Sequence, residues 1–198
     1  MTGLFVRPST TALLVVDVQE RLLPAMPRHE QTRLIACNEL LLEAAKRFGM
    51  LTHFTEQYPR GLGPTVVPLR AYCTEDDDRV GRTEKTTFSA MDSPTVQVRF
   101  QLAKVDTVIV TGMEAHVCVF QTVRALLGLG LHVHVPFDAV ASRDPEAKRT
   151  ALALLSSAGA HITTTETVVF DLLQDAQHPH FKALSALVKN LPMGPNPS

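Results

Sequence analysis

Residues 105–129 read VDTVIVTGMEAHVCVFQTVRALLGL, and this stretch decides the predicted fold. Residues 105–111 form an apolar run typical of a buried strand, and residues 119–129 carry apolar side chains at helical spacing. The tight segment between them ends at Cys118. A thiol between the carboxyl end of a strand and the amino end of a helix lies where α/β proteins bind their ligands. The helix dipole there favours an anion, so we expect the Cys118 thiolate to be favoured over the thiol.

Strand and helix patterns alternate along the rest of the chain. Further strands are expected at residues 12–18, 51–55, 131–135 and 161–163, and helices at residues 31–48, 94–102, 116–129, 145–158, 165–173 (with Thr165 as its cap) and 178–189. Residues 56–82 read as a long loop. This alternation predicts a three-layer α/β fold, in which helices cover both faces of a doubly wound, mostly parallel central sheet. Residues 1–190 are expected to form a single domain and residues 191–198 a flexible tail.

The composition indicates an ordinary globular protein. Of the 198 residues, 45% are hydrophobic and 20% are charged, and the formal net charge is −1. No basic run points to nucleic acid, and no apolar stretch reaches the roughly 18 residues that a membrane-spanning helix needs. The N-terminus lacks the pattern of a signal peptide, and the three cysteines are too widely spaced for a disulfide framework. We therefore expect a cytoplasmic protein with no nucleic-acid or membrane partner.

Asp17 and Lys85 are candidates to meet Cys118. Asp17 ends the first predicted strand, and Lys85 lies in an extended segment that follows the long loop. Because the carboxyl ends of parallel strands share one edge of a sheet, we expect an acid, an amine and a thiol at that edge. Together they would supply a nucleophile, a proton acceptor and an orienting cation. Taken singly, Asp17 is equally consistent with a residue that caps a turn, and Lys85 with a solvated surface lysine.

The sequence resembles the isochorismatase-like cysteine hydrolase superfamily, which includes the nicotinamidases. The resemblance extends over residues 10–190 and rests on three motifs in the same order and spacing: LVVDVQ at 14–19, KTTFS at 85–89 and VTGMEAHVCV at 110–119. It is strongest to the isochorismatase domain-containing branch, through TEQYPRGLGPT at 55–65 and DAQHPHFK at 175–182.

The resemblance implies a mechanism and a role for each motif. Asp17 would take the thiol proton, Cys118 would attack a carbonyl carbon to form an acyl-enzyme, and Lys85 would hold Asp17 ionised. A cis peptide bond would join Met113 and Glu114 and aim backbone N–H groups at the substrate oxygen. The expected activity is metal-independent hydrolysis of a small amide or related acyl substrate by a Cys-Lys-Asp triad.

The remaining pocket is expected to draw on residues near the same edge of the sheet. The candidate substrate-binding residues are Gln19, Glu56, Tyr58, Phe88 and His116. For each of them, ordinary loop packing is the alternative. Nicotinamidases bind a metal through an aspartate and histidines after the second strand, but residues 53–58 lack an Asp-x-His pair. We therefore expect neither a metal nor another cofactor.

Other functions remain open beside hydrolysis. The resemblance implies a homo-oligomer, with the loop at 57–65 and the C-terminal helix as candidate interfaces. A family member that no longer turns over a metabolite would serve as an oligomeric interaction or scaffold protein. A redox sensor based on Cys118 is a third possibility, because activated thiols oxidise readily.

Overall fold

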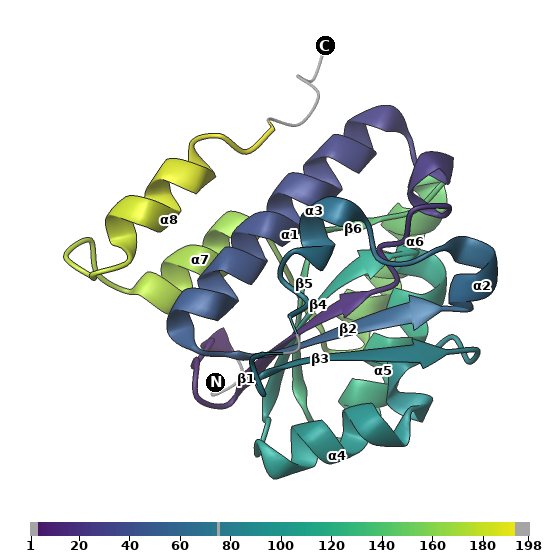
Figure 1. Cartoon of the computed structure of the whole chain (residues 1–198), viewed down its shortest axis with the longest axis horizontal. Coiled ribbons are helices and arrows are strands. Elements are labelled where there is room, and N and C mark those ends of the chain that lie inside the picture. The colour runs from purple at the N-terminus through teal and green to yellow at the C-terminus, as the bar shows by residue number, and fades with distance from the viewer. Residues whose placement is uncertain (1–3, 75, 193–198) are drawn as a thin grey trace.

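A single parallel sheet organises the molecule (Figure 1). In the computed structural model, which describes residues 4–74 and 76–192, seven strands form this sheet in the order β3-β2-β1-β4-β5-β7, and the short β6 pairs with β4. The strands are β1 (Thr11–Val16), β2 (Leu51–Gln57), β3 (Val80–Lys85), β4 (Thr107–Met113), β5 (His132–Pro136), β6 (Val140–Ala141) and β7 (His161–Thr163). All the paired strands of the described chain run parallel.

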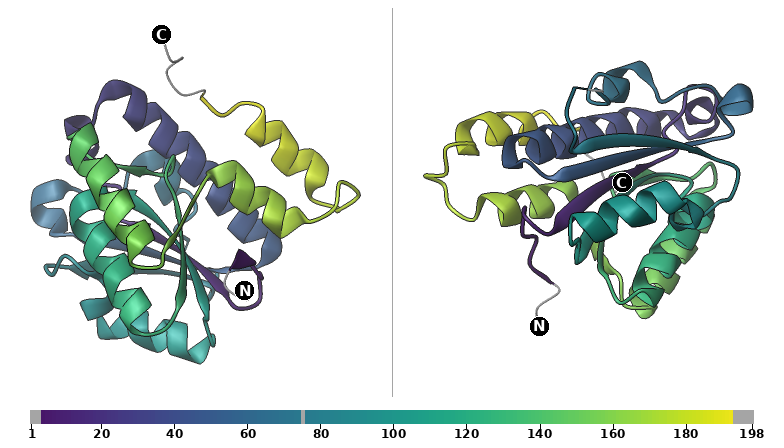
Figure 2. Two further views of the ribbon diagram at one scale, coloured as in Figure 1. Left: turned by 180° about the vertical axis from the view of Figure 1, so that it is seen from behind. Right: turned by 60° about the horizontal axis from the view of Figure 1, so that its bottom comes forward.

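Helices cover both faces of the sheet and complete the predicted three layers (Figure 2). The helices are α1 (Arg28–Phe48), α2 (Pro59–Leu62), α3 (Val67–Arg70), α4 (Pro94–Leu102), α5 (Phe120–Gly128), α6 (Pro145–Ser157), α7 (Thr165–Leu173) and α8 (Phe181–Val188). One apolar core joins α1, α3, α7 and α8 to the first face, and a second joins α4, α5 and α6 to the other. Each fully buried aliphatic side chain of these cores contributes about 1.5–3 kcal/mol.

The strand register brings distant segments to one edge of the sheet. Val16 at the end of β1 lies between Thr55 of β2 and Gly112 of β4. Farther along the same edge, Gln57 pairs with Lys85. The residues that follow or end β1, β2, β3 and β4 therefore meet at the carboxyl edge, as the α/β topology predicts.

Gly112 lets β4 approach β1 closely. Its φ is 110°, and a Cβ atom there would lie 1.9 Å from the carbonyl oxygen of Val16. No side chain fits at such a distance, so only glycine allows the two strands to lie this close. The end of β4 then leads directly into the segment that carries Cys118.

Most predicted elements are found within a few residues of their expected bounds, and the differences are local. Residues 56–82 are not one loop, because they contain α2, α3 and the start of β3. Thr164, rather than Thr165, caps α7 by accepting a hydrogen bond from the Thr167 N–H. Leu191 of the predicted tail packs against the first core, and residues 193–198 lie outside the described residues. Within the described chain, no helix has both the length and the apolar character needed to cross a bilayer.

Candidate active site

Asp17 lies in the centre of the carboxyl edge. It follows β1 directly, is 0% exposed and has a left-handed φ of 52°. Its carboxylate accepts hydrogen bonds from Thr55 Oγ1 at 2.7 Å and from Lys85 Nζ at 2.6 Å. The buried negative charge is thus compensated by a cation and a hydroxyl rather than by water.

Lys85 reaches this carboxylate from the last position of β3. It is 7% exposed, and its ammonium also donates to Gln57 Oε1 at 2.7 Å. Two longer contacts run to the backbone carbonyls of Thr87 at 3.2 Å and Phe88 at 3.1 Å. The lysine is therefore a fixed internal cation and not a solvated surface residue.

Cys118 completes the group. It lies in a π-helical turn, Ala115–Val119, just before α5, and is 6% exposed. Asp17 acts on this thiol both through its charge and as a hydrogen-bond acceptor. Burial, followed by the negative charge of Asp17, raises the pKa of the Cys118 thiol from 9.0 to about 12, although Lys85 opposes this shift. Desolvation and the charge of Asp17 therefore oppose the resting thiolate that the helix dipole was expected to favour.

The segment before the nucleophile is held by an ion pair. The peptide bond between Met113 and Glu114 is cis, and the Met113 side chain lies in the first core. The Glu114 side chain, 5% exposed, pairs with Arg143, which donates from Nη2 at 2.8 Å and from Nε at 3.1 Å. The backbone N–H of Arg143 adds a third hydrogen bond at 3.0 Å. Glu114 is thus committed to Arg143 and is not a free carboxylate.

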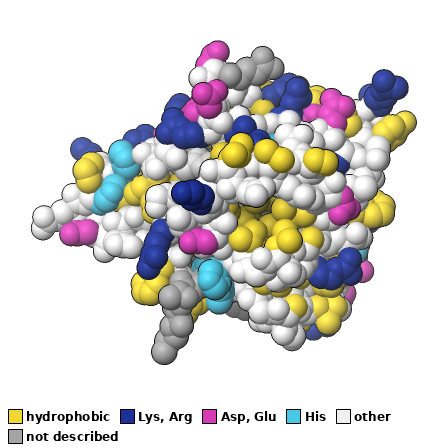
Figure 3. Space-filling model, turned by 90° about the horizontal axis from the view of Figure 1, so that it is seen from below, with side chains coloured by type: hydrophobic (Ala, Val, Ile, Leu, Met, Phe, Trp, Pro, Cys, Tyr) yellow, Lys and Arg dark blue, Asp and Glu magenta, His cyan; other side chains and the backbone are white. Residues whose placement is uncertain are grey.

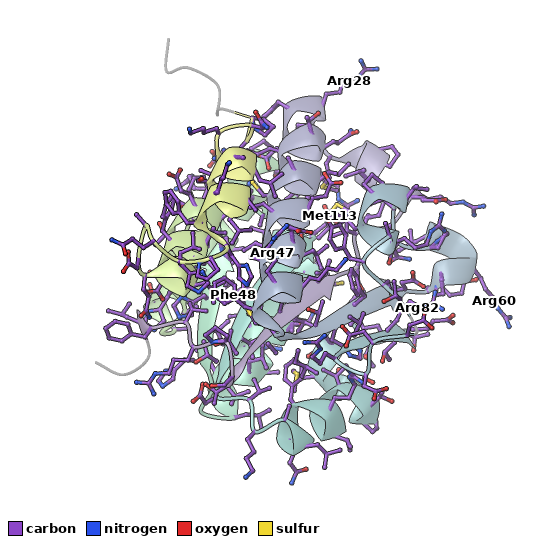
Figure 4. The ribbon with its side chains drawn as sticks, turned by 60° about the vertical axis from the view of Figure 1, so that its left-hand side comes forward. Arg28, Arg47, Phe48, Arg60, Arg82 and Met113 are labelled. Carbon is purple, nitrogen blue, oxygen red and sulfur yellow. The ribbon has the colours of Figure 1, made fainter. Side chains whose placement is uncertain are left out.

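A cleft of about 590 Å³ borders the group and is lined by Lys85 together with residues 58–60, 84, 86–87 and 92–94. Tyr58, at its rim, is 55% exposed. Arg60 extends outward from α2 (Figure 4). Phe88 is 50% exposed and adjoins Lys85 through its backbone carbonyl. Tyr58 therefore lies at the rim of the cleft, whereas Phe88 contacts Lys85 through its backbone and is not among the residues that line the cleft.

Gln19 occupies a different setting from the one expected. It is 0% exposed, and its amide forms hydrogen bonds with the backbone of Gln57 and with the carbonyl of Gly63. These partners use both ends of the amide. Gln19 therefore joins β2 to the loop after α2 instead of facing an open cavity.

Glu56 and His116 also point away from the triad candidates. Glu56 lies on the opposite face of β2 from Thr55, where it accepts hydrogen bonds from the N–H and hydroxyl of Thr65. His116 Nδ1 lies 2.9 Å from Ser142 Oγ, and the ring lines a groove beside α6. The structure brings neither side chain into contact with Asp17, Lys85 or Cys118 among the described residues.

The sequence of the described fold matches a known family. The family model described as the isochorismatase domain matches residues 11–167, which include Asp17, Lys85 and Cys118. The chain belongs to the isochorismatase family. This match shows the family that the three sequence motifs resemble.

Curated relatives within the isochorismatase family are similar over most of the chain. Isochorismatase domain-containing protein 2 of Danio rerio is 35% identical over 178 residues, covering 90% of this chain and 86% of that protein. Isochorismatase domain-containing protein 1 of Danio rerio is 34% identical over 185 residues. That alignment covers 92% of this chain, but the chain spans only 62% of the relative's length.

Solved structures share the isochorismatase fold. A structure described as MAR1 ribonuclease from Caenorhabditis elegans is 37% identical, with a TM-score of 0.87 and coverage of 96% of this chain and 95% of that one. A pyrazinamidase/nicotinamidase from Streptococcus mutans is 25% identical, with a TM-score of 0.66 and coverage of 77% and 99%. The fold expected from the sequence is thus confirmed.

Three residues that bind the expected side chains of this isochorismatase-family site were not among the expected site residues. Thr55 binds Asp17, Gln57 binds Lys85, and Arg143 binds Glu114. Thr55 and Gln57 alternate along the end of β2 and so share one face, a pattern that could have indicated both residues once Asp17 was a candidate. Arg143 comes from the segment after β6, and the sequence carries no signal of its pairing.

Histidines and carboxylates do not gather into a metal site in the described part of the chain. There, no group of three or more His, Cys, Asp or Glu side chains is placed to hold an ion. His178 and His180 pack against Phe48, with ring centroids 5.1 Å and 5.4 Å from its ring. These rings belong to the contact between α1 and the loop before α8.

Proposed function

We propose that the protein is a cysteine hydrolase of a small amide or related acyl substrate. The observation that carries this proposal is the buried group at the carboxyl edge of the sheet, in which Lys85 donates to Asp17 at 2.6 Å and Asp17 in turn acts on the Cys118 thiol. A thiol, a carboxylate in contact with it and a cation in contact with the carboxylate are the parts that acyl transfer to cysteine requires. The cleft beside Lys85 gives a small substrate a place to bind.

The proposed reaction has two half-reactions. In the first, Cys118 Sγ bonds to the substrate carbonyl carbon and its proton passes to Asp17. The tetrahedral intermediate then collapses, the C–N bond breaks, and the proton on Asp17 goes to the leaving amine. In the second, Asp17 takes a proton from water as the water attacks the thioester, and the C–S bond breaks to restore the thiol.

Backbone N–H groups are proposed to receive the substrate oxygen. The Glu114 N–H belongs to the cis peptide bond, and the Cys118 N–H lies within the π-helical turn. The Arg143 ion pair neutralises the Glu114 carboxylate, whose free charge would otherwise oppose the oxyanion. Loss of one backbone N–H donor to an oxyanion typically lowers the rate about 10²–10³-fold. The ion pair is therefore proposed to matter for the rate, because it keeps a free carboxylate away from these donors.

The resting state of Cys118 favours hydrolysis over redox sensing. A thiol with a pKa of about 12 that is 6% exposed carries little thiolate at neutral pH. Oxidation by peroxide requires thiolate and access, so a sensor cysteine has the opposite properties. In the proposed reaction the Cys118 thiolate forms only as the thiol attacks a substrate carbonyl and passes its proton to Asp17.

The names of the neighbours suggest substrates to test. One neighbour is described as a ribonuclease and another as a pyrazinamidase/nicotinamidase. This chain has a formal net charge of −1, and on the face shown in Figure 3 basic and acidic side chains are interspersed. An extended basic surface is what RNA binding needs, so this face favours a small substrate over RNA.

Trapping of the acyl-enzyme tests the proposal. The protein and a Cys118→Ala variant are incubated with small amides, esters, nicotinamide and a short RNA, and intact mass is followed with time. An acyl adduct that forms on the wild type, disappears with turnover and is absent from the variant is the expected result. If no compound labels the protein and a thiol-directed probe also fails to reach Cys118, the scaffold function replaces hydrolysis.

We also propose that the chain forms a homo-oligomer. Val98 and Leu102 on α4 are 51% and 79% exposed, which leaves apolar surface in water. Light scattering should give a multiple of 21.7 kDa, the mass of one chain. A mass equal to one chain at micromolar concentration would overturn the oligomer.

A further inference from the structure

The ammonium of Lys85 is fully occupied by acceptors of the protein itself. It donates to Asp17 Oδ2 at 2.6 Å, to Gln57 Oε1 at 2.7 Å, and to the carbonyls of Phe88 and Thr87 at 3.1 Å and 3.2 Å. An ammonium has only three hydrogens to donate, so these four oxygens leave none for a substrate. Lys85 therefore acts through its charge and through Asp17, and does not itself hold the substrate.

The amide of Gln57 has one orientation that satisfies both of its partners. Its Nε2 donates to the carbonyl of Thr86 at 2.8 Å, which leaves Oε1 to face the Lys85 ammonium. A flipped amide would place two donors together at Lys85 and two acceptors together at Thr86. The two contacts therefore fix which atom meets the cation.

The backbone of Gln57 is clamped by Gln19. Gln19 Oε1 accepts from the Gln57 N–H at 2.8 Å, and Gln19 Nε2 donates to the Gln57 carbonyl at 3.0 Å. Nε2 also donates to the carbonyl of Gly63 at 2.6 Å. Because Gln19 is 0% exposed, rotation of its amide would leave buried polar atoms without partners. This reciprocal pair holds the end of β2, and with it the oxygen that meets Lys85.

A neutral acceptor at position 57 suits the electrostatics of the thiol. Asp17 raises the pKa of Cys118 and Lys85 lowers it. A second carboxylate beside Lys85 would cancel part of the effect of the cation and raise that pKa further. An amide oxygen holds the ammonium without adding negative charge.

We propose that Gln57 is a positioning residue, whose amide oxygen, fixed by Gln19 and Thr86, holds the Lys85 ammonium against Asp17. This inference rests on the proposed function, in which Asp17 and Lys85 control the Cys118 proton. It also assigns recognition of the substrate oxygen to groups other than Lys85. Gln57 touches no reacting atom and acts through the lysine.

The rate of Cys118 alkylation by iodoacetamide across a range of pH tests the proposal without any substrate. Gln57→Glu is expected to slow alkylation about tenfold at pH 8, because a new carboxylate next to Lys85 disfavours the thiolate. Gln57→Met is expected to slow it severalfold, because an unanchored ammonium stabilises the thiolate less. Mass mapping in a Cys73→Ser background assigns the label to Cys118.

A purely structural role for Gln57 predicts the opposite result. A loosened site exposes the thiol, so alkylation would become faster or stay unchanged while the melting temperature falls. Gln97→Glu, the same substitution at an α4 residue bonded to the Met91 carbonyl, is the control and should keep the wild-type profile. Superimposable profiles for Gln57→Glu and the wild type overturn the inference. Failure of the acyl-trapping screen overturns only the proposed hydrolysis, since alkylation reports deprotonation regardless of turnover.

Discussion

At the scale of single residues, the site is a set of buried carboxylates that are each matched with a cation. Lys85 is paired with Asp17, and Arg143 with Glu114. Removal of one partner from a buried pair leaves an uncompensated charge, typically at a cost of about 3–5 kcal/mol. Variants at these positions therefore need a check of folding before their chemistry is compared.

Asp17 and Lys85 should have opposite effects on the Cys118 thiol. Asp17→Asn removes the charge and the acceptor that raise the thiol pKa, so alkylation by iodoacetamide at pH 8 should become faster. Lys85→Met removes the cation that lowers it, so alkylation should become slower. Rates are measured by mass spectrometry, with circular dichroism to verify the fold.

Hydrolysis should fall in both variants, by at least about 10²-fold for Asp17→Asn, because no base then accepts the thiol proton. An Asp17→Asn protein that is both more reactive toward iodoacetamide and inactive in hydrolysis would separate thiol ionisation from proton transfer. Equal alkylation rates in the two variants would contradict the charge balance described here.

At the scale of elements, the close approach of β4 to β1 shapes the site. Gly112→Ala places a Cβ 1.9 Å from the Val16 carbonyl oxygen at a φ of 110°, so the two strands must separate. We expect a loss of more than about 4 kcal/mol in the free energy of unfolding, measured by urea denaturation. Because Asp17 follows β1 directly, displacement of this strand end should also change the rate at which iodoacetamide alkylates Cys118.

Gly159→Ala is a matched control for this strain. Gly159 has a similar φ of 105°, but a Cβ there meets nothing within 4 Å. This variant should lose only the backbone cost of about 1–3 kcal/mol. Equal losses at both positions would show that the strand contact adds nothing to the conformational cost.

The same elements show which parts of the fold are readable from sequence. β1 is buried along its whole length, so its apolar run predicts a strand directly. β3 reads VGRTEK, and as an edge strand with exposed polar side chains it lacks that run. Helices of four residues, such as α2 and α3, are too short to show a periodic pattern.

A candidate site residue can be predicted from the sequence where the end of a predicted strand carries a single reactive side chain. Asp17 and Cys118 each follow a buried strand, and Lys85 lies in a motif of its own. Their contacts depend on the register between β1, β2 and β3, which the sequence does not display. For that reason Thr55 and Gln57 were missed, whereas Gln19 was expected to contact substrate and instead binds backbone.

At the scale of the whole molecule, the order of the strands determines which distant segments of the chain must pair during folding. β1 lies between β2 and β4, so the site forms only when segments about 100 residues apart in sequence pair. When α4 packs against β2 and β3, it buries polar residues on that face of the sheet. His53 is one of them, at 0% exposure, with its Nε2 2.9 Å from Thr83 Oγ1.

Because of His53, the free energy of unfolding should decrease as the solution is made more acidic. Burial, and then the charge of Arg99, lowers the pKa of His53 from 6.5 to about 4 in the folded protein. The unfolded chain therefore binds a proton below pH 6.5 that the folded chain refuses until about pH 4. Over this window the free energy of unfolding should drop by about 3 kcal/mol as the pH falls, and recover as it rises.

Urea denaturation between pH 7 and pH 4 measures this slope. His53→Gln, which stays neutral throughout and can still bond Thr83, should flatten the curve even where its stability at pH 7 is lower. His29→Gln, at a residue whose side chain is 61% exposed, should keep the wild-type slope. The slope is the informative quantity, because a lost hydrogen bond changes stability equally at every pH whereas a suppressed protonation changes only its pH dependence. A His53→Gln curve parallel to the wild type would assign the acid sensitivity to other groups.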